Sequence, residues 1–386
     1  RNTITMQDRA AKAKIYLVTN GATQRRVGVI TLPSFYEDVE ARQKGDKDYR
    51  SASRDVARLL VDMKARNVDS LLMDLRNNGG GSLREAIELT GLFVGKVPVV
   101  QARDAQGGIT VERNYRIDMA WDRPIGVLIS RASASASEIF AAAIQDYGRG
   151  LIIGEASFGK GTVQTVASLD QIARNAKPSY GELKMTIAQF FRVNGGTTQL
   201  RGVTPDIGFP GTLDAADYGE SSFDNALPWT SVKAADYAPV GDVKAQLPVL
   251  LALHENRVRR DKDFQNRLQA ITQAQEVRKS NVISLNEEVR RKEREQQEKR
   301  LVAMQGVASA SALTDDGLQS NERKLSKDLA AERTRDSVKD VFLNEAVSIL
   351  ADGVALNSEG KARMTMNPRS TGPLVVMELP AGTMGR

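Results

Sequence analysis

The sequence of 386 residues contains no cysteine and only one histidine, His254. The absence of cysteine excludes a thiol nucleophile, disulfide bonds and zinc sites built on cysteine ligands. A Ser-His-Asp triad or a histidine-rich metal centre would have to use His254, and we expect a solvated histidine on a helix there instead. If the chain is a hydrolase, its general base is therefore expected to be a lysine, an aspartate or a glutamate.

Long apolar runs are also absent from the sequence, because no stretch reaches the roughly 18 residues that a membrane-spanning helix requires. The apolar content of 41% and the charged content of 26% are those of an ordinary globular protein. The net charge is +6, but much of the basic charge lies in one C-terminal run. We therefore expect a solvated helical surface and not a nucleic-acid-binding one.

Strand-like and helix-like segments alternate as far as residue 210, which predicts an α/β (α+β) domain of layered sheet and helix. Strands are expected at residues 27–32, 69–75, 97–101, 125–130, 151–153, 162–166 and 183–191 and around Val203. Beyond Pro210 a passage rich in Gly, Asp and Ser leads into a long, charged, helical region. A last helix is expected near 323–352, and a strand-like run follows at 374–379.

A serine-rich segment, residues 133–138 (SASASE), opens one of the predicted helices. Ser135 and Glu138 have the spacing of a capping box, so the segment is consistent with a plain helix N-terminus. The same place would give a serine nucleophile free backbone N–H groups and a partial positive charge, which stabilise an oxyanion. Small neighbours, Ala134 and Ala136, would let a substrate backbone approach. The segment alone leaves both interpretations open.

Lys160 lies between two glycines and between two strand-like runs. A lysine can act as a general base only if burial or a neighbouring cation lowers its pKa, and a tight turn between buried strands could bury the amine. An exposed lysine in a hairpin turn is the alternative. Residues 154–161 (GEASFGKG) also resemble a phosphate-binding P-loop. However, Gly161 replaces the magnesium-binding hydroxyl and a strand follows, so nucleotide binding is not expected.

Residues 77–81 (NNGGG) follow a predicted strand. Glycine adopts backbone conformations that other residues avoid, so this loop could turn an amide towards an oxyanion. A flexible turn or a phosphate cradle fits the same residues. By itself the loop does not decide between these functions.

Four segments together resemble the C-terminal processing peptidases, which are Ser-Lys endoproteases, and most closely their large tail-specific type from the Gram-negative periplasm. The segments are residues 74–81 (DLRNNGGG), 133–138, 158–164 (FGKGTVQ) and 201–206 (RGVTPD). The resemblance continues through residues 223–229 (FDNALPW) into the helical region, to about residue 355.

The resemblance implies a role for individual residues of this chain. It implies that Ser135 is the nucleophile, that Lys160 is the base and that Gln164 helps to position the lysine. It further implies an oxyanion hole built from the glycine loop and the start of the helix, with Gly80, Gly81 and Ala136 as its members. It implies neither a metal nor a cofactor.

Two acidic residues of the helix that begins at the serine-rich segment are expected to have structural or auxiliary roles. Asp146 has been considered functional in such enzymes, but it follows Ser135 by eleven residues. In a continuous helix that spacing corresponds to roughly 16 Å along the axis, so Asp146 cannot touch Ser135. Glu138, within the capping-box pattern, is the second auxiliary candidate.

The resemblance also implies a ClpP/crotonase-like core of strands and helices that is followed by a mainly α-helical C-terminal domain. The expected parts are the exit from a PDZ domain that the chain mostly lacks (1–26), the protease core (27–210), a linker and anchor (211–229), the helical domain (230–356) and a tail whose strand-like run resembles a PDZ strand (357–386).

Location and partners are implied by the same resemblance. The implied location is the periplasm, with association to the inner membrane on its periplasmic side. The implied partners are protein substrates with apolar C-termini, among them peptidoglycan enzymes, a helical-repeat lipoprotein adaptor and further copies in a homo-oligomer, but not nucleic acid. A non-catalytic scaffold that binds C-terminal tails, or a resting form without PDZ activation, is the alternative.

Overall fold

The computed structural model describes residues 10–20, 23–175, 179–211, 213–214, 216–280, 282, 284–293, 295, 339–358 and 374–378. The chain divides into two compact units, the first formed by Arg1–His254 with Glu345–Arg386 and the second by Glu255–Asn344. All the segments that the sequence singles out for chemistry belong to the first unit.

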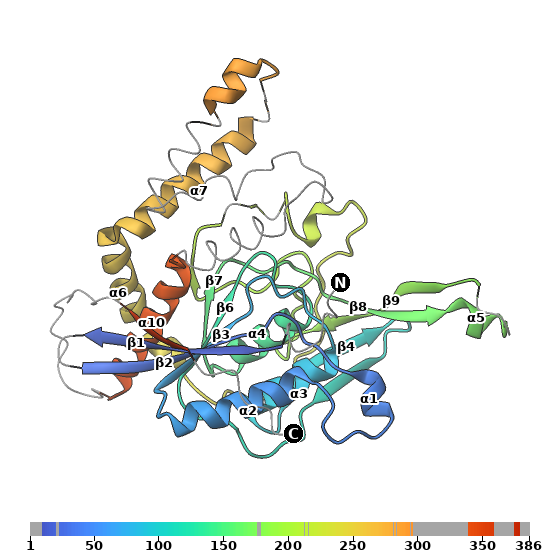
Figure 1. Cartoon of the computed structure of the whole chain (residues 1–386). Helices are drawn as coiled ribbons and strands as arrows, with labels where there is room; N and C mark the ends of the chain where they lie inside the picture. Colours follow the sequence, from blue (N-terminus) through green and yellow to red (C-terminus); the bar gives the residue numbers. More distant parts are fainter. Residues whose placement is uncertain are drawn as a thin grey trace, which may run out of the picture. The chain divides into compact units, whose positions relative to one another are not determined.

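The described helices and strands follow the chain in the order shown by the colours of Figure 1. They are β1 (Lys12–Asn20), β2 (Thr23–Thr31), α1 (Val39–Gln43), α2 (Ala52–Ala65), β3 (Ser70–Asp74), α3 (Leu83–Val94), β4 (Pro98–Asp104), β5 (Ile109–Arg113), β6 (Ile125–Ile129), α4 (Ala136–Asp146), β7 (Leu151–Gly154), β8 (Thr162–Ser168), α5 (Leu169–Ile172), β9 (Glu182–Phe191), β10 (Ile207–Gly208), η2 (Glu220–Ser222), η3 (Val243–Gln246), α6 (Leu247–Arg260), α7 (Lys262–Ser280), α10 (Val341–Ser358) and β11 (Val375–Glu378).

A seven-stranded sheet, with the order β10-β7-β6-β3-β2-β1-β11, forms the centre of the first unit. Strands β2, β3, β6, β7 and β10 are parallel, whereas β1 and β11 join antiparallel at one edge. Every residue of β3 and β6 is buried, as expected of parallel strands covered on both faces. The predicted α/β core with a helical C-terminal region is confirmed.

Helices pack against both faces of this sheet. Gly28 of β2 pairs with Leu71 of β3, and Gly126 of β6 pairs with the next residue of β3, so the two glycines face opposite sides. A side chain at Gly28 would lie 2.8 Å from Met63 of α2, and one at Gly126 would lie 2.9 Å from Leu350 of α10. Both glycines therefore allow a helix to approach the sheet closely.

The core under α4 is built around three fully buried aromatic rings. The ring of Phe140, on α4, lies 6.4 Å from that of Phe35 and 5.7 Å from that of Phe93 on α3. Such tilted and edge-on ring pairs add to the stability that burial provides. The packing fixes the helix that begins with the serine-rich segment.

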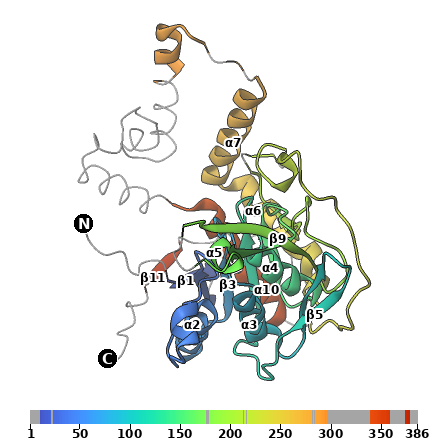
Figure 2. The ribbon, with the colours of Figure 1, turned by 90° about the vertical axis from the view of Figure 1, so that its right-hand side faces the viewer.

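A second, antiparallel sheet has the order β5-β4-β9-β8. Its edge strand β8 begins directly after the glycine-flanked lysine. Figure 1 shows that β8, β9 and α5 project from the rest of the unit, and Figure 2 shows α5 from the side to which they project. The sheet therefore places the start of β8 against the core and its end in solvent.

The second unit has a small apolar centre of its own. Phe264 and Ile271 of α7 are buried, and the Phe264 ring packs edge-on against Phe342 at 5.5 Å. Lys339 and Asp263 form an ion pair of 2.6 Å. Within the described ranges, no helix combines the length and the apolar character that crossing a membrane requires.

Two expectations from the sequence are wrong. No strand forms around Val203, which lies buried in a loop and donates its N–H to Ser157 Oγ at 2.7 Å. His254 is not solvated, because it is buried on α6 with its Nδ1 atom 2.8 Å from Glu345 Oε1 of α10. A polar partner on a distant helix allows this burial, and the sequence near His254 does not reveal such a partner.

Some expectations lie wholly or partly outside the described residues. Of the helix predicted over 323–352, residues 339–352 are described, and α10 extends to Ser358. Of residues 1–26 and 357–386, the described parts include β1, which pairs with β2 and β11. The four boundaries between the five expected parts remain predictions.

Truncating Phe140 to alanine should lower the free energy of unfolding by about 3–5 kcal/mol, because it empties a fully buried aromatic site. Urea unfolding followed by circular dichroism would measure this. Val61→Ala on α2 is the matched control, since Val61 is 67% exposed and its loss should cost less than about 0.5 kcal/mol. Equal destabilisation by the two changes would contradict the described core.

Candidate active site

Three serines alternate at the start of α4, but only the middle one is accessible. The Ser133 hydroxyl donates to the Leu75 carbonyl oxygen at 2.9 Å, and the Ser137 hydroxyl donates to the Asn78 carbonyl oxygen at 2.8 Å. Both side chains are fully buried, whereas Ser135 is half-buried. The outer serines therefore join the helix start to the glycine loop and to Leu75 just before it, and Ser135 is the accessible serine of the three.

Ser135 has a strained backbone, with φ 57° and ψ −113°. Residues with a side chain rarely adopt a positive φ, and such strain persists only where the surroundings enforce it. A serine on a strained turn between a strand and a helix is also the arrangement that exposes the nucleophile in α/β-hydrolases. No glycine marks this position in the sequence, so the strain could not be predicted.

The glycine loop lies directly against Ser135. A side chain at Gly80, which has φ 102°, would lie 2.8 Å from Ser135 Cβ and 3.0 Å from Ala136 N, so only glycine fits. The Gly80 N–H donates to Asn78 Oδ1 at 2.9 Å and is therefore already used. The Gly81 N–H has no hydrogen-bond partner among the described residues, and the Ala136 N–H lies in the first turn of α4, where N–H groups lack a partner within the helix.

Glu138 is fully buried, and its carboxylate holds both predicted catalytic residues. Its Oε2 atom accepts from the Ser135 N–H at 2.8 Å and from the Lys160 N–H at 2.9 Å. Its Oε1 atom accepts from the Ser157 hydroxyl at 2.6 Å and from the Gly159 N–H at 2.7 Å. One oxygen atom thus brings the backbones of Ser135 and Lys160 together, although 25 residues separate them along the chain.

Burial raises the pKa of Glu138 to about 7, even though its four hydrogen bonds lower it. Because the folded-state pKa lies above the ordinary value of 4.5, protonation of Glu138 favours the folded state, and this contribution is lost as the pH rises through about 7. The four hydrogen bonds favour the ionised carboxylate instead, because a protonated carboxyl group loses acceptor capacity. All four donors are therefore satisfied best above about pH 7.

Lys160 belongs to residues 157–161, which we call the base loop. Burial lowers the pKa of the Lys160 amine, and nearby Lys184 lowers it further, while Glu220 and Glu138 act in the opposite direction. Among the described residues, the Lys160 amine has no hydrogen-bond or ion-pair partner. It therefore makes no hydrogen bond to the Ser135 hydroxyl. A half-buried, unpaired amine of lowered pKa is what a lysine general base requires.

The base loop is not a phosphate-binding loop, because Lys160 is followed by strand β8 and not by a helix. The Gly161 N–H, which would face a phosphate in such a loop, donates to Gln199 Oε1 at 2.8 Å. The sequence reasoning missed both Gln199 and Ser157. Neither lies in a pattern that a single sequence reveals, because their partners come from other loops.

Gln164 lies on β8 and does not hydrogen-bond to Lys160. Its amide nitrogen donates to Thr162 Oγ1 at 2.7 Å and to Thr186 Oγ1 at 3.4 Å. In this structure Gln164 joins the two strands of the projecting hairpin at the end nearest the base loop.

Asp146 lies at the opposite end of α4 from Ser135. Its carboxylate binds the Arg192 guanidinium through both oxygens, at 2.6 Å and 3.0 Å, and accepts from Asn194 Nδ2 at 2.9 Å. A bidentate, mostly buried ion pair of this kind fixes geometry. These contacts support the expected structural role of Asp146.

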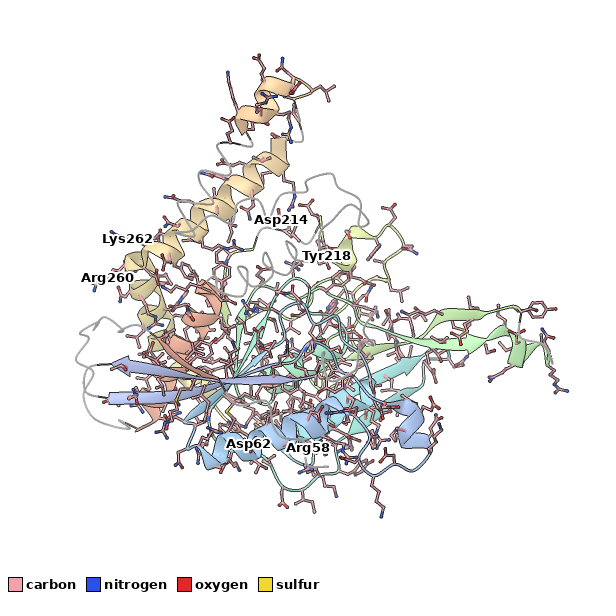
Figure 3. The ribbon with its side chains drawn as sticks, in the orientation of Figure 1. Arg58, Asp62, Asp214, Tyr218, Arg260 and Lys262 are labelled. Carbon is pink, nitrogen blue, oxygen red and sulfur yellow. The ribbon has the colours of Figure 1, made fainter. Side chains whose placement is uncertain are left out.

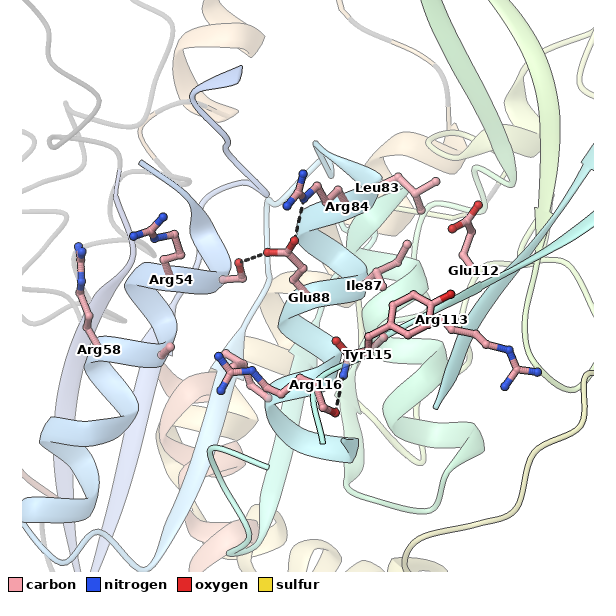
Figure 4. Close-up of a pocket in the computed structure, with 14 residues that line it drawn as sticks. Arg54, Arg58, Leu83, Arg84, Ile87, Glu88, Glu112, Arg113, Tyr115 and Arg116 are labelled. Atoms are coloured by element: carbon pink, nitrogen blue, oxygen red, sulfur yellow. Dashed lines mark hydrogen bonds and ion pairs between the residues drawn. The ribbon is translucent and has the colours of Figure 1, made fainter. Parts of the chain in front are cut away.

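A groove of about 830 Å³ lies between α2, α3 and the residues that follow β5 (Figure 4). Leu83 and Ile87 of α3 line it together with Tyr115 and several arginines, of which Arg84 pairs with Glu88 at 2.7 Å. Neither Ser135 nor Lys160 lines this groove. The hydrogen bonds of the loops, and not the shape of a cavity, therefore identify the candidate catalytic centre.

Comparison with known proteins identifies the family of the chain. Residues 26–209 match peptidase family S41, and residues 213–355 match the C-terminal domain of tail specific protease. The chain therefore belongs to peptidase family S41 over residues 26–209.

Within that family, the chain is similar to the tail-specific protease of Haemophilus influenzae, with 37% identity over 364 residues, 94% of this chain and 49% of that protein. It is 35% identical to the carboxy-terminal-processing protease of Bartonella bacilliformis over 44% of this chain and 37% of that protein. The solved structure of the photosystem II D1 C-terminal processing protease has 25% identity and a TM-score of 0.41, covering 58% of this chain and 54% of that one. The chain spans about half the length of the tail-specific protease that it matches.

Glu138→Gln should lower kcat/KM for cleavage of an unfolded protein about 100-fold, because an amide NH₂ would replace one acceptor oxygen and displace one of the two loops. Casein cleavage, with the unfolding midpoint checked in parallel, would measure this. Glu88→Gln is the control, since its carboxylate pairs with Arg84 outside the catalytic loops. Wild-type kcat/KM in Glu138→Gln would show that the shared carboxylate is dispensable.

Proposed function

We propose that the chain is the catalytic part of a serine endopeptidase with a Ser135–Lys160 dyad. The observation that carries the proposal is the Glu138 carboxylate, which binds the backbones of both residues through one oxygen atom. The strained, accessible serine and the half-buried, unpaired lysine support it further. Membership of peptidase family S41 supports peptidase activity in general.

In the proposed mechanism, the neutral amine of Lys160 takes the proton of the Ser135 hydroxyl as Oγ attacks the carbonyl carbon of the scissile peptide bond. The N–H groups of Gly81 and Ala136 stabilise the oxyanion, and Gly80 leaves room for it against Ser135. The lysine then gives the proton to the leaving amine. Water hydrolyses the acyl-enzyme in the same way, with Lys160 again acting as the base.

Gln164 completes the proposed site. Its amide nitrogen donates to Thr162 and Thr186, and Thr162 opens β8 two residues after Lys160. By fixing this end of the hairpin, Gln164 limits the directions in which Lys160 can extend. Its proposed role is thus to position the base loop through the strand and not through a bond to the amine.

The proposed substrates are periplasmic proteins that the enzyme trims or degrades from apolar C-terminal tails. Two relatives are named for tail-specific or carboxy-terminal processing, which supports this choice. Peptidoglycan enzymes are proposed among the substrates, a helical-repeat lipoprotein as an adaptor, and a homo-oligomer at the periplasmic side of the inner membrane as the working form. A PDZ domain would recognise the tails.

A tail-binding scaffold without catalysis is the second candidate, and a direct cleavage assay separates the two. Ser135→Ala should abolish casein cleavage, with at least a 10³-fold loss, because the neighbouring Ser133 and Ser137 hydroxyls are buried and bonded to carbonyl oxygens and cannot replace it. Ser168→Ala, at the start of α5 on the projecting hairpin, should leave the rate unchanged. Equal cleavage by wild type and Ser135→Ala would overturn the proposed nucleophile. Absence of cleavage by the wild-type chain would favour the scaffold or a resting form.

The value of kcat/KM should fall as the pH is lowered. Protonation removes the free amine of Lys160, and the buried Glu138 loses acceptor capacity below about pH 7, so both changes reduce activity in the same direction. Initial rates across a buffer series would show this acid limb. Activity that rises as the pH falls through this range would exclude a lysine base.

A further inference from the structure

The base loop is covered by residues that lie beyond the family S41 match, which ends at residue 209. We call residues 216–223 the clasp. The Phe158 ring packs edge-on against Tyr218 of the clasp at 5.6 Å and lies 6.5 Å from Phe223. The Glu220 N–H donates to the Phe158 carbonyl oxygen at 3.0 Å. Tyr218 and Asp214 are labelled in Figure 3, and the Tyr218 N–H donates to the Asp214 carbonyl oxygen at 3.0 Å.

Gln199 connects the clasp to the residue that follows Lys160. Its side chain is fully buried, its Oε1 atom accepts from the Gly161 N–H at 2.8 Å, and its Nε2 atom donates to Glu220 Oε1 at 3.1 Å. The Leu200 N–H donates to the carbonyl oxygen of Gly159, the residue before Lys160, at 2.9 Å. The chain on both sides of Lys160 is thus fixed by residues 199–200.

The partners of Gln199 determine the orientation of its amide. The acceptor oxygen must face the Gly161 N–H, and the donor NH₂ group must face a carboxylate, because the reversed orientation would place two donors together. Glu220 supplies that carboxylate. Glu220 therefore reaches the base loop along two routes, through the Gln199 amide and through its own backbone bond to Phe158.

Glu220 also belongs to the charges that face the Lys160 amine. Lys184 of β9 disfavours the protonated amine, whereas Glu220 and Glu138 favour it. Glu138 is fixed in the core of α4, but Glu220 lies in the passage that leads to the C-terminal helices. The charge beside the amine therefore depends on a segment outside the strands and helices of the peptidase core.

We propose that Gln199 and Glu220 are positioning residues for the catalytic base, so that the clasp completes an active site that the peptidase core does not complete alone. Gln199 fixes the base loop, and Glu220 orients Gln199 and places a negative charge beside the amine. This inference rests on the proposed function of Lys160.

The test of the Glu220 charge uses the full chain and the variant Glu220→Gln. The new amide oxygen can still accept from Gln199, so the change removes the charge and keeps the hydrogen bond. Loss of a negative charge favours the neutral amine, so the acid limb of kcat/KM should move to lower pH. Asp214→Asn, an exposed carboxylate next to the clasp that is not among the charges acting on Lys160, should leave it in place. No movement in Glu220→Gln, or equal movement in both variants, would overturn the proposed role of Glu220.

A second readout does not depend on cleavage. Acetylation of the Lys160 amine by acetic anhydride, followed across pH by peptide mass spectrometry, reports its free-amine fraction directly. Its midpoint should also move to lower pH in Glu220→Gln and stay in place in Asp214→Asn.

If Ser135→Ala still cleaves casein while this midpoint moves as expected, the proposed function fails and the Glu220 contact stands. If Ser135→Ala is inactive and the midpoint does not move, the function stands and this inference is wrong.

Gln199→Ala tests the positioning step. Release of the base loop should lower kcat about 100-fold with little change in KM, because the loop carries the proposed base. In the Gln199→Ala, Glu220→Ala double variant the additional loss from the second change should be small, because the hydrogen bond that Glu220→Ala removes is already absent in Gln199→Ala. Wild-type kcat in Gln199→Ala, with an unchanged unfolding midpoint, would contradict the positioning role.

Discussion

The candidate active site depends on one buried carboxylate, that of Glu138, which accepts four hydrogen bonds from two places in the chain, the start of α4 and the base loop. Burial of an unpaired carboxylate would be very costly, so the carboxylate stabilises the fold only while the donors surround it. The requirement is mutual, because the Ser135 N–H and two N–H groups of the base loop have this carboxylate as their acceptor. Displacement of either loop would leave a charge without its donors, and this links the position of the nucleophile to that of the base.

The surrounding contacts hold the loops in place without taking part in chemistry. The Ser137 hydroxyl donates to a carbonyl oxygen of the glycine loop, the Ser133 hydroxyl donates to that of Leu75 just before the loop, and Asp146 binds Arg192 at the far end of α4. The strain at Ser135 is compatible with such a frame, because strong contacts on both sides prevent relaxation. Within the described part of the chain the Lys160 amine has no hydrogen-bond partner, and the Ser135 hydroxyl stays accessible. The proposed chemistry needs both of these groups.

The sequence predicted those parts that depend on local pattern. Continuous apolar runs marked β3, β6 and β7, and the helical spacing after Ser135 marked α4. The order of four motifs predicted the family, and the resemblance implied that Ser135 and Lys160 act together. Local pattern was sufficient for these strands because parallel strands that are buried on both faces have continuous apolar sequences.

Long-range polar contacts could not be predicted in this way. Glu138 fits a capping box in the sequence, and its bonds to the base loop arise only when two segments of the fold meet. His254 was expected in solvent and is buried against Glu345, while the apolar character of Val203 suggested a strand and reflects a buried loop. In each case a partner far along the chain determines the environment of the residue.

Native-state hydrogen exchange of the backbone amides of Ser135, Gly159 and Lys160 tests the central claim most directly. If one carboxylate holds both the start of α4 and the base loop, these three N–H groups should be protected from exchange. They should also exchange with the same opening free energy at a given pH. Protection of Ser135 together with unprotected, rapidly exchanging amides at Gly159 and Lys160 would contradict the account, because the two loops would then open independently.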